Sequence, residues 1–90
     1  MSKDKHLVYI LQCGDGSLYT GYTNNLQRRL QMHEAGKGAK YTRGRGPFHV
    51  LHVEYFPTKA EAMQREYYIK QLRREQKLSL VTAKKGSDQS

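Results

Sequence analysis

Four side chains in the first third of the chain are of types that can act together on a phosphate ester. Tyr9 and Tyr19 place phenols on two segments with strand character, and Arg29 and His33 lie four residues apart on a predicted helix. Residues at positions i and i+4 share one stripe of a helix. A guanidinium can hold two phosphate oxygens in its fork, and a phenol or an imidazole can accept or donate a proton. Each residue alone also fits a structural role, but together the four favour one reactive cleft.

The relation between the two tyrosines depends on the turn that separates them. Residues 14–16 read Gly-Asp-Gly, which is a turn signal between two strand-like segments. If these three residues form the loop, Tyr9 lies opposite Gly21 and Leu11 opposite Tyr19, so both phenols face the same side. Gly21 then leaves an open spot between the phenols where a ligand can approach the backbone. A two-residue loop would place the tyrosines on opposite faces.

Three apolar segments predict a small sheet that would hold these phenols. They span residues 7–12, 17–22 and 48–56, and Pro57 ends the third. Connections as short as residues 14–16 favour antiparallel pairing.

A first helix is predicted over residues 25–35, directly after the second strand. Asn24 is the expected cap, with a glutamine three residues later, and Gly36 is the expected stop. Leu26 and Leu30 would then face the sheet, with Arg29 and His33 beside them.

Two further helical segments follow the third strand. Thr58 and Glu61 form a capping-box pair that opens a helix reaching about residue 72, and a second amphipathic segment covers about 74–81. The order ββα-β-αα predicts an α+β fold with a small antiparallel three-stranded sheet flanked by helices.

The chain of 90 residues fits a single domain, which we expect to span residues 1–83, with a disordered tail at 84–90. The longest apolar run, residues 7–11, is far too short to span a membrane, and no signal peptide is visible. Cys13 is the one cysteine, which excludes an intrachain disulfide. These features predict a cytoplasmic protein without a membrane partner.

The charge of the chain predicts a polyanionic partner. The sequence has 16 Lys and Arg against 8 Asp and Glu, a formal net charge of +8. Such an excess concerns partners rather than fold, and polyphosphates such as DNA are the commonest partners of small basic domains. Residues 36–47 contain no acid, and their basic residues are expected to contact the DNA backbone: Lys37, Lys40, Arg43 and Arg45. A flexible solvated loop is an equally good interpretation of this segment.

The tyrosines lie in two triplets, Val8-Tyr9-Ile10 and Tyr19-Thr20-Gly21, which resemble the paired triplets of the GIY-YIG nuclease family. Arg29 falls where the family has its catalytic arginine, and His33 matches a histidine often found one turn later. Two positions depart from the family pattern: Val8 replaces a glycine and Thr20 replaces the central isoleucine. The resemblance is nearest to the small, single-domain, largely uncharacterised bacterial branch of the family.

The resemblance also covers the second predicted helix, where Glu66 matches the family's metal-binding glutamate. It implies a metal-dependent endonuclease that hydrolyses DNA phosphodiester bonds. Because few carboxylates are well placed, a single Mg²⁺ or Mn²⁺ ion held by Glu66, waters and substrate phosphate fits better than a two-metal site. Lys70 lies at i+4, so Glu66 can also be read as half of a helix-surface ion pair.

Two other functions remain open at this point. One is a non-catalytic nucleic-acid-binding module that keeps the nuclease fold, and the other is a subunit whose basic face docks an acidic protein. Retention of Tyr9, Tyr19, Arg29 and Glu66 together favours the enzyme. Because the chain has no separate recognition domain, a protein partner is a possible source of specificity.

Overall fold

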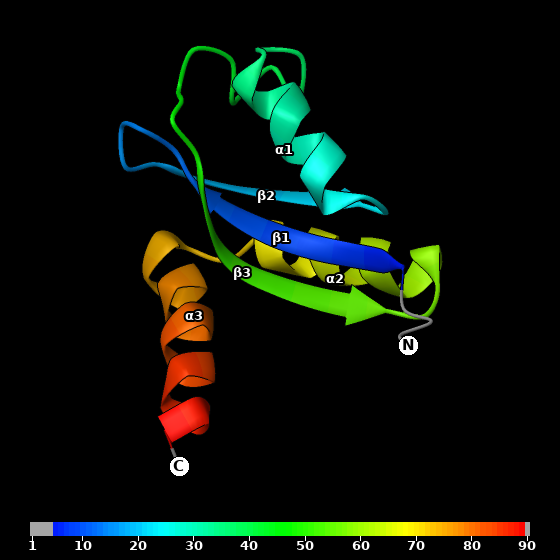
Figure 1. The fold of residues 1–90 in the computed structure, drawn as a ribbon. Coiled ribbons are helices and arrows are strands. Elements are labelled where there is room, and N and C mark those ends of the chain that lie inside the picture. Colours follow the sequence, from blue (N-terminus) through cyan, green and yellow to red (C-terminus); the bar gives the residue numbers. More distant parts are fainter. Residues whose placement is uncertain (1–4, 90) are drawn as a thin grey trace.

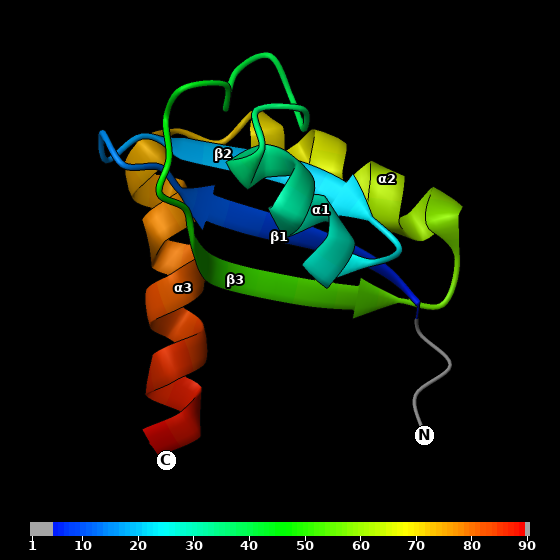
Figure 2. The same cartoon turned by 45° about the horizontal axis from the view of Figure 1, so that its top comes forward.

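The sheet has three antiparallel strands and is covered by helices on both faces. The computed structural model describes residues 5–89, with side chains through residue 81. In chain order the elements are β1 (His6–Gln12), β2 (Leu18–Thr23), α1 (Leu26–Glu34), β3 (His49–Phe56), α2 (Lys59–Lys70) and α3 (Arg74–Gln89). The strand order is β2-β1-β3, and α1 and α2 lie on opposite sides of the sheet (Figures 1 and 2). The predicted α+β class and order of elements are confirmed.

The central strand β1 is buried on both faces, which explains its unbroken apolar sequence. Val8 and Ile10 pack against Ala62 and Ile69 of α2, and the alternate residues of β1 pack against the leucines of α1. Tyr9 is among these alternate residues and is 0% exposed. Side chains of a strand alternate between its faces, so one short segment supplies both halves of the core.

The hairpin between β1 and β2 has the register that the three-residue loop predicts. Tyr9 pairs with Gly21 and Leu11 with Tyr19. Gly16 has a positive φ of 87°, a conformation that glycine adopts without steric cost and that is typical of three-residue hairpin loops. Both phenols therefore lie on the α1 face of the sheet.

Helix α1 begins one residue later than predicted. The cap is Asn25, whose side-chain oxygen accepts a hydrogen bond from the backbone N–H of Arg28, so the assignment of Asn24 as cap was wrong. The Thr23 hydroxyl accepts a hydrogen bond from the backbone N–H of Asn25 and fixes the chain at that residue. The helix ends at Glu34 with Ala35 as its C-cap, one residue before the predicted end, and the predicted stop Gly36 follows with a φ of 78°, a left-handed glycine typical of helix ends.

Helices α2 and α3 begin where the sequence predicts. Thr58 caps α2 through the backbone N–H of Glu61, and α2 ends at Lys70, slightly before the predicted residue 72. Helix α3 continues to Gln89, past the predicted end near residue 81.

The domain boundary at residue 83 and the disordered tail stay predictions, and residue 90 lies outside the described residues. Over residues 5–89, no helix has the length and apolar character needed to cross a membrane.

The two neighbouring asparagines provide a test of the start of α1. Asn25→Ala removes the capping oxygen and should lower the free energy of unfolding by about 1 kcal/mol. Asn24→Ala removes a side chain of the same type that caps nothing and should change stability by less than half as much. Urea unfolding of both variants measures the difference. A larger loss for Asn24→Ala would contradict this boundary.

Candidate active site

A chain of hydrogen bonds links β1, α1 and the loop that follows α1. The Tyr9 hydroxyl lies 2.9 Å from Nε2 of His33, and Nδ1 of His33 lies 2.8 Å from Oγ1 of Thr42. Thr42 donates in turn to the backbone carbonyl of Ala39 at 3.0 Å. Tyr9, His33 and Thr42 are each at most 1% exposed, so the chain is closed to bulk water.

The direction of this chain follows from the single proton of the Thr42 hydroxyl. Thr42 gives that proton to the Ala39 carbonyl, so its oxygen accepts a hydrogen bond from Nδ1–H of His33. A neutral imidazole that is protonated at Nδ1 has an acceptor at Nε2. Tyr9 therefore donates its proton to His33.

The electrostatics of the site keep Tyr9 protonated and His33 neutral. Burial raises the pKa of the Tyr9 phenol to about 12, although the Arg29 guanidinium beside it opposes this rise. Burial also lowers the pKa of His33, and the positive charge of Arg29 lowers it further. The negative charge of Glu66 adds a smaller rise to the pKa of Tyr9.

The space left by Gly21 is filled by the two phenols. A Cβ atom added to Gly21 would lie 2.5 Å from the Tyr9 hydroxyl oxygen and 2.9 Å from Cε2 of Tyr19. The expected open spot for a ligand beside Gly21 is therefore wrong. The missing side chain instead lets the Tyr9 ring extend across β2.

Tyr19 continues the aromatic contacts from the buried chain toward the surface. Its ring centroid lies 5.4 Å from that of His33 and 6.3 Å from that of Tyr9. On its other side it stacks on Tyr41, a loop residue that the sequence analysis did not single out. Tyr9, Tyr19 and His33 together form what we call the tyrosine-histidine cluster.

Arg29 reaches the cluster from the exposed side of α1. One terminal nitrogen of its guanidinium donates to the Gly38 carbonyl at 3.3 Å, while its buried Nε has no partner among the described residues. The Tyr9 and Tyr19 phenols raise the pKa of Arg29, against the opposing effect of burial. Arg29 is thus held by Gly38 and the two phenols, and its Nε–H is the donor left for an anion.

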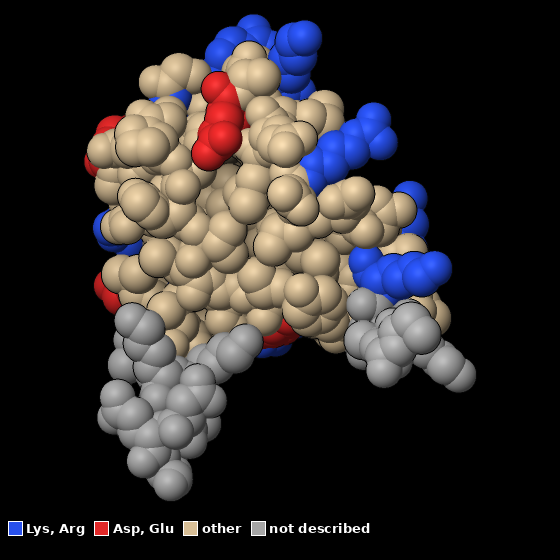
Figure 3. Space-filling view, viewed as in Figure 1, with Lys and Arg blue, Asp and Glu red and all other residues tan. Residues whose placement is uncertain are grey.

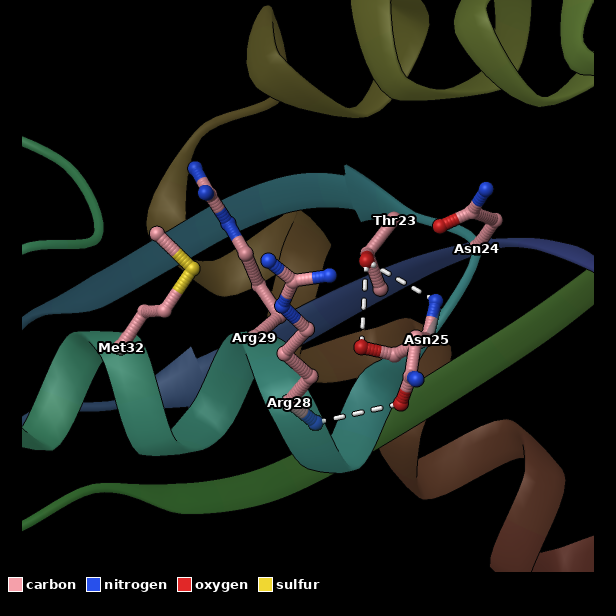
Figure 4. A pocket seen from close by; sticks show the side chains of 6 residues that line it. All are labelled: Thr23, Asn24, Asn25, Arg28, Arg29 and Met32. Atoms are coloured by element: carbon pink, nitrogen blue, oxygen red, sulfur yellow. Dashed lines mark hydrogen bonds between the residues drawn. The ribbon is translucent and has the colours of Figure 1, made fainter.

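Arg29 also borders a surface hollow of about 350 Å³, which we call the arginine hollow (Figure 4). Its lining comes from the end of β2 and the first two turns of α1: Thr23, Asn24, Asn25, Arg28, Arg29 and Met32. The guanidiniums of Arg28 and Arg29 both extend from α1 into the space beside β2 (Figure 4). The lining contains two cations and no carboxylate, which suits an anionic ligand.

Glu66 is the carboxylate that α2 brings toward the cluster. Its side chain is 12% exposed and pairs with Lys70 at 3.3 Å, so the helix ion pair considered from the sequence is present. Among the described residues, no group of three or more His, Cys, Asp and Glu side chains could hold a metal ion. One carboxylate with free coordination positions still fits Mg²⁺, because Mg²⁺ usually keeps several waters.

The basic loop after α1 is partly a structural element. Arg45 pairs with Asp15 of the hairpin loop, and its guanidinium lies 4.6 Å from the centre of the Tyr41 ring. Lys37, Lys40 and Arg43 are exposed. On the face shown in Figure 3, Lys and Arg lie mainly along the upper and right-hand margins, and the centre carries almost none. The three exposed cations remain candidates for backbone contacts, whereas Arg45 ties the loop to the sheet.

The sequence analysis missed Thr42 and Tyr41, although both complete the site. Thr42 orients His33, and Tyr41 covers Tyr19. Both lie in an irregular segment, where no periodic pattern separates buried from exposed positions. The one feature of the sequence that could have pointed to Thr42 and Tyr41 as site residues is that they lie next to basic residues in the chain.

Comparisons with known proteins found a matching family model, similar sequences and similar solved structures. A family model described as the GIY-YIG catalytic domain matches residues 5–79. A UPF0213 protein of Oceanobacillus iheyensis is 70% identical over 78 residues, which cover 87% of this chain and 91% of that protein. The solution NMR structure of a UPF0213 protein from Bacillus halodurans shares 57% identity and a TM-score of 0.58, covering 88% of this chain and 84% of that chain. That of a protein from E. faecalis shares 42% identity and a TM-score of 0.58, covering 86% and 83%.

Gly21→Ala tests the packing of the two phenols. The added methyl group would meet the Tyr9 hydroxyl and the Tyr19 ring at distances that real Cβ atoms do not tolerate. Overpacking of this kind should cost about 1–3 kcal/mol in the free energy of unfolding. Gly46→Ala is the matched control, since its nearest contact, with the Phe48 ring, would be an ordinary 3.5 Å. Equal stability of the two variants would show that the space beside Gly21 is open.

The buried neutral His33 predicts a pH dependence of stability. Its pKa is lowered in the folded state, so the unfolded chain binds a proton first as the pH falls below about 6.5. The stability due to neutral His33 is complete above that pH and decreases below it. Urea unfolding between pH 7.5 and 5 should show the stability advantage of wild type over His33→Gln becoming smaller at acid pH. An advantage that grows toward acid pH would contradict the neutral assignment.

Proposed function

The chain belongs to the GIY-YIG catalytic domain family, and we propose that it is a metal-dependent endonuclease that hydrolyses phosphodiester bonds in DNA. The observation that carries the proposal is the Tyr9 hydroxyl, which donates to a neutral His33 and lies beside Arg29. This arrangement places a path for a proton, from Tyr9 to His33, beside Arg29, a group that can bind an anion. We call the Tyr9–His33 pair the proton path. A core tyrosine with a purely structural role needs the acceptor but not the cation beside it.

Arg29 is the proposed ligand of the reacting phosphate. Its guanidinium hydrogen-bonds to the Gly38 carbonyl and to the Tyr9 and Tyr19 phenols, and the donors that remain, the unpaired Nε–H among them, would bind non-bridging oxygens. A planar fork binds two phosphate oxygens at once and stabilises the additional negative charge of the transition state. Arg28, in the same arginine hollow, would contact a neighbouring part of the strand.

Tyr9 does not act as a free phenolate in this mechanism. With a pKa of about 12, only on the order of 10⁻⁵ of the phenol is ionised at pH 7. The neutral phenol instead takes a proton from the attacking water while it passes its own proton to Nε2 of His33, and this step requires that strand binding uncovers the Tyr9 hydroxyl, which is 0% exposed without DNA. The water oxygen forms its bond to phosphorus, the bond to the leaving oxygen breaks, and that oxygen takes a proton from solvent.

His33 receives the proton because its second nitrogen is already held. Nδ1–H stays bonded to Thr42, so protonation at Nε2 needs no ring rotation. The lowered pKa of His33 makes the resulting imidazolium short-lived, and it returns its proton after the reaction. Tyr19 packs on both rings and limits the water that can enter.

Glu66 is the residue that would hold a divalent cation. When bound, such an ion neutralises negative charge on the phosphate and leaving oxygens. Lys70 lies 3.3 Å from the same carboxylate and would compete with the cation for it. The +8 net charge and the exposed cations of the loop support DNA as the substrate, through contacts with its backbone.

Nicking of supercoiled plasmid DNA in the presence of Mg²⁺ tests the proposal. Tyr9→Phe interrupts the proton path and should lower the cleavage rate by about 10²–10⁴. Tyr22→Phe is the matched control, because its hydroxyl bonds to His6 at 2.7 Å and belongs to the other face of the sheet. Glu66→Gln keeps the shape of the side chain and should abolish Mg²⁺-dependent cleavage while DNA binding persists.

The melting temperature of each variant must accompany its rate, because Tyr9 is fully buried. DNA binding by wild type without any cleavage would refute the enzyme and leave a non-catalytic binding module. Equal cleavage by folded Tyr9→Phe and Tyr22→Phe would refute the proton path.

A further inference from the structure

A second hollow, of about 370 Å³, adjoins the tyrosine-histidine cluster, and we call it the lysine hollow. Side chains from β2, the loop after α1, α2 and α3 line it: Leu18, Tyr19, Thr20, Tyr41, Lys70 and Lys77. It shares Tyr19 with the cluster, and its Lys70 contacts Glu66 at 3.3 Å. It is therefore a direct neighbour of the proposed reaction site. Its volume lies within the range of small-ligand pockets.

Two ammonium groups from different helices converge on this hollow. The pKa of Lys77 is lowered by burial and by the positive charge of Lys70. Over the part of the chain that the structure describes, Lys77 makes no ion pair. Lys70 is already paired with the Glu66 carboxylate, whereas Lys77 is partly desolvated beside the charge of Lys70, so an anionic ligand in the hollow would be stabilised mainly by Lys77.

A buried hydroxyl provides an independent observation. Thr20 lines the hollow and is 3% exposed, and its Oγ1 has no hydrogen-bond partner among the described residues. Buried polar atoms are rarely left unpaired, so this hydroxyl is accounted for if a ligand accepts its proton. Thr20 is also the residue that replaces the isoleucine of the second family triplet.

The wall of the hollow is aromatic. Tyr41 is 44% exposed, and its ring stacks on that of Tyr19 with centroids 5.9 Å apart and planes inclined by 25°. Arg45 lies over the Tyr41 ring and helps to hold it. Exposed rings beside cations are the surfaces on which nucleobases stack.

We propose that the lysine hollow is a nucleotide subsite for the substrate strand, next to the phosphate that is cleaved. Lys70 and Lys77 bind a neighbouring phosphate, Thr20 donates to it, and the attached nucleoside packs against Tyr41 and Tyr19. This inference rests on the proposed function, since it assumes that the strand passes the tyrosine-histidine cluster. With the arginine hollow at Arg29, it gives the strand one cationic contact on each side of the cluster.

Binding of thymidine 5′-monophosphate to the full chain without Mg²⁺ tests the subsite apart from catalysis. In a titration of ¹⁵N-labelled protein, the amide signals of Thr20, Tyr41 and Lys77 should shift. Lys77→Met and Thr20→Val should each weaken binding of the nucleotide and of a short oligothymidylate by about five- to tenfold. Lys59→Met is the control, because it removes the same charge from an exposed position at the start of α2.

Salt dependence gives a second measurement on the same proteins. Lys77→Met should reduce the slope of log affinity against log salt by about one phosphate contact, whereas Thr20→Val should leave it unchanged. Affinity losses for Lys77→Met no larger than for Lys59→Met would overturn the subsite. Equal binding of inorganic phosphate and thymidine 5′-monophosphate would also overturn it, in favour of a bare anion site.

The cleavage assay separates the two proposals. Unchanged KM for Lys77→Met in an enzyme that cleaves normally would overturn the subsite and leave the nuclease intact. Specific nucleotide binding at Thr20 and Lys77 in a protein that never cleaves would support the subsite as a binding site and refute the enzyme.

Discussion

The buried hydroxyl of Tyr9 must have a hydrogen-bond partner, and the site is built around this requirement. A phenol removed from water without a partner is costly, and His33 supplies the acceptor at 2.9 Å. His33 can accept only because Thr42 holds its other nitrogen, which in turn fixes the loop after α1. One polar group in the core therefore specifies how a strand, a helix and a loop meet.

The sheet separates this polar network from the rest of the core. On one face of β1, Val8 and Ile10 pack against Ala62 and Ile69 with hydrocarbon alone. On the other face Tyr9 lies between two leucines and meets the imidazole of α1. The α2 face adds a polar network of its own, in which Arg65 of α2 pairs with Glu54 and Glu54 contacts His52, whereas the α1 face combines burial with the Tyr9–His33–Thr42 chain. Glu66 also belongs to α2, so this helix contributes to the core on its own face of the sheet and to the candidate site.

Local signals in the sequence were sufficient for the elements. The Gly-Asp-Gly turn left two registers open, and the structure has the one with a three-residue loop, which pairs Tyr9 with Gly21. The choice between Asn24 and Asn25 was not predictable, since it depends on the hydrogen bond that the backbone N–H of Asn25 donates to the Thr23 hydroxyl. The ring that fills the space at Gly21, and the roles of Thr42 and Tyr41, depend on contacts between distant segments. Periodicity and spacing carry no record of such contacts in an irregular loop.

In the loop after α1, residues that bind the candidate site alternate with residues that face solvent. Gly38 packs on the His33 ring and binds Arg29, and Thr42 binds His33, so these positions are fixed by the reacting groups. Lys37, Lys40 and Arg43 lie between or beside them and face solvent. In the proposed nuclease, their replacement would change the attraction for different polyanions without moving any atom of the Tyr9–His33–Thr42 chain. Substrate preference and the proposed reaction would then be separable traits within one short segment.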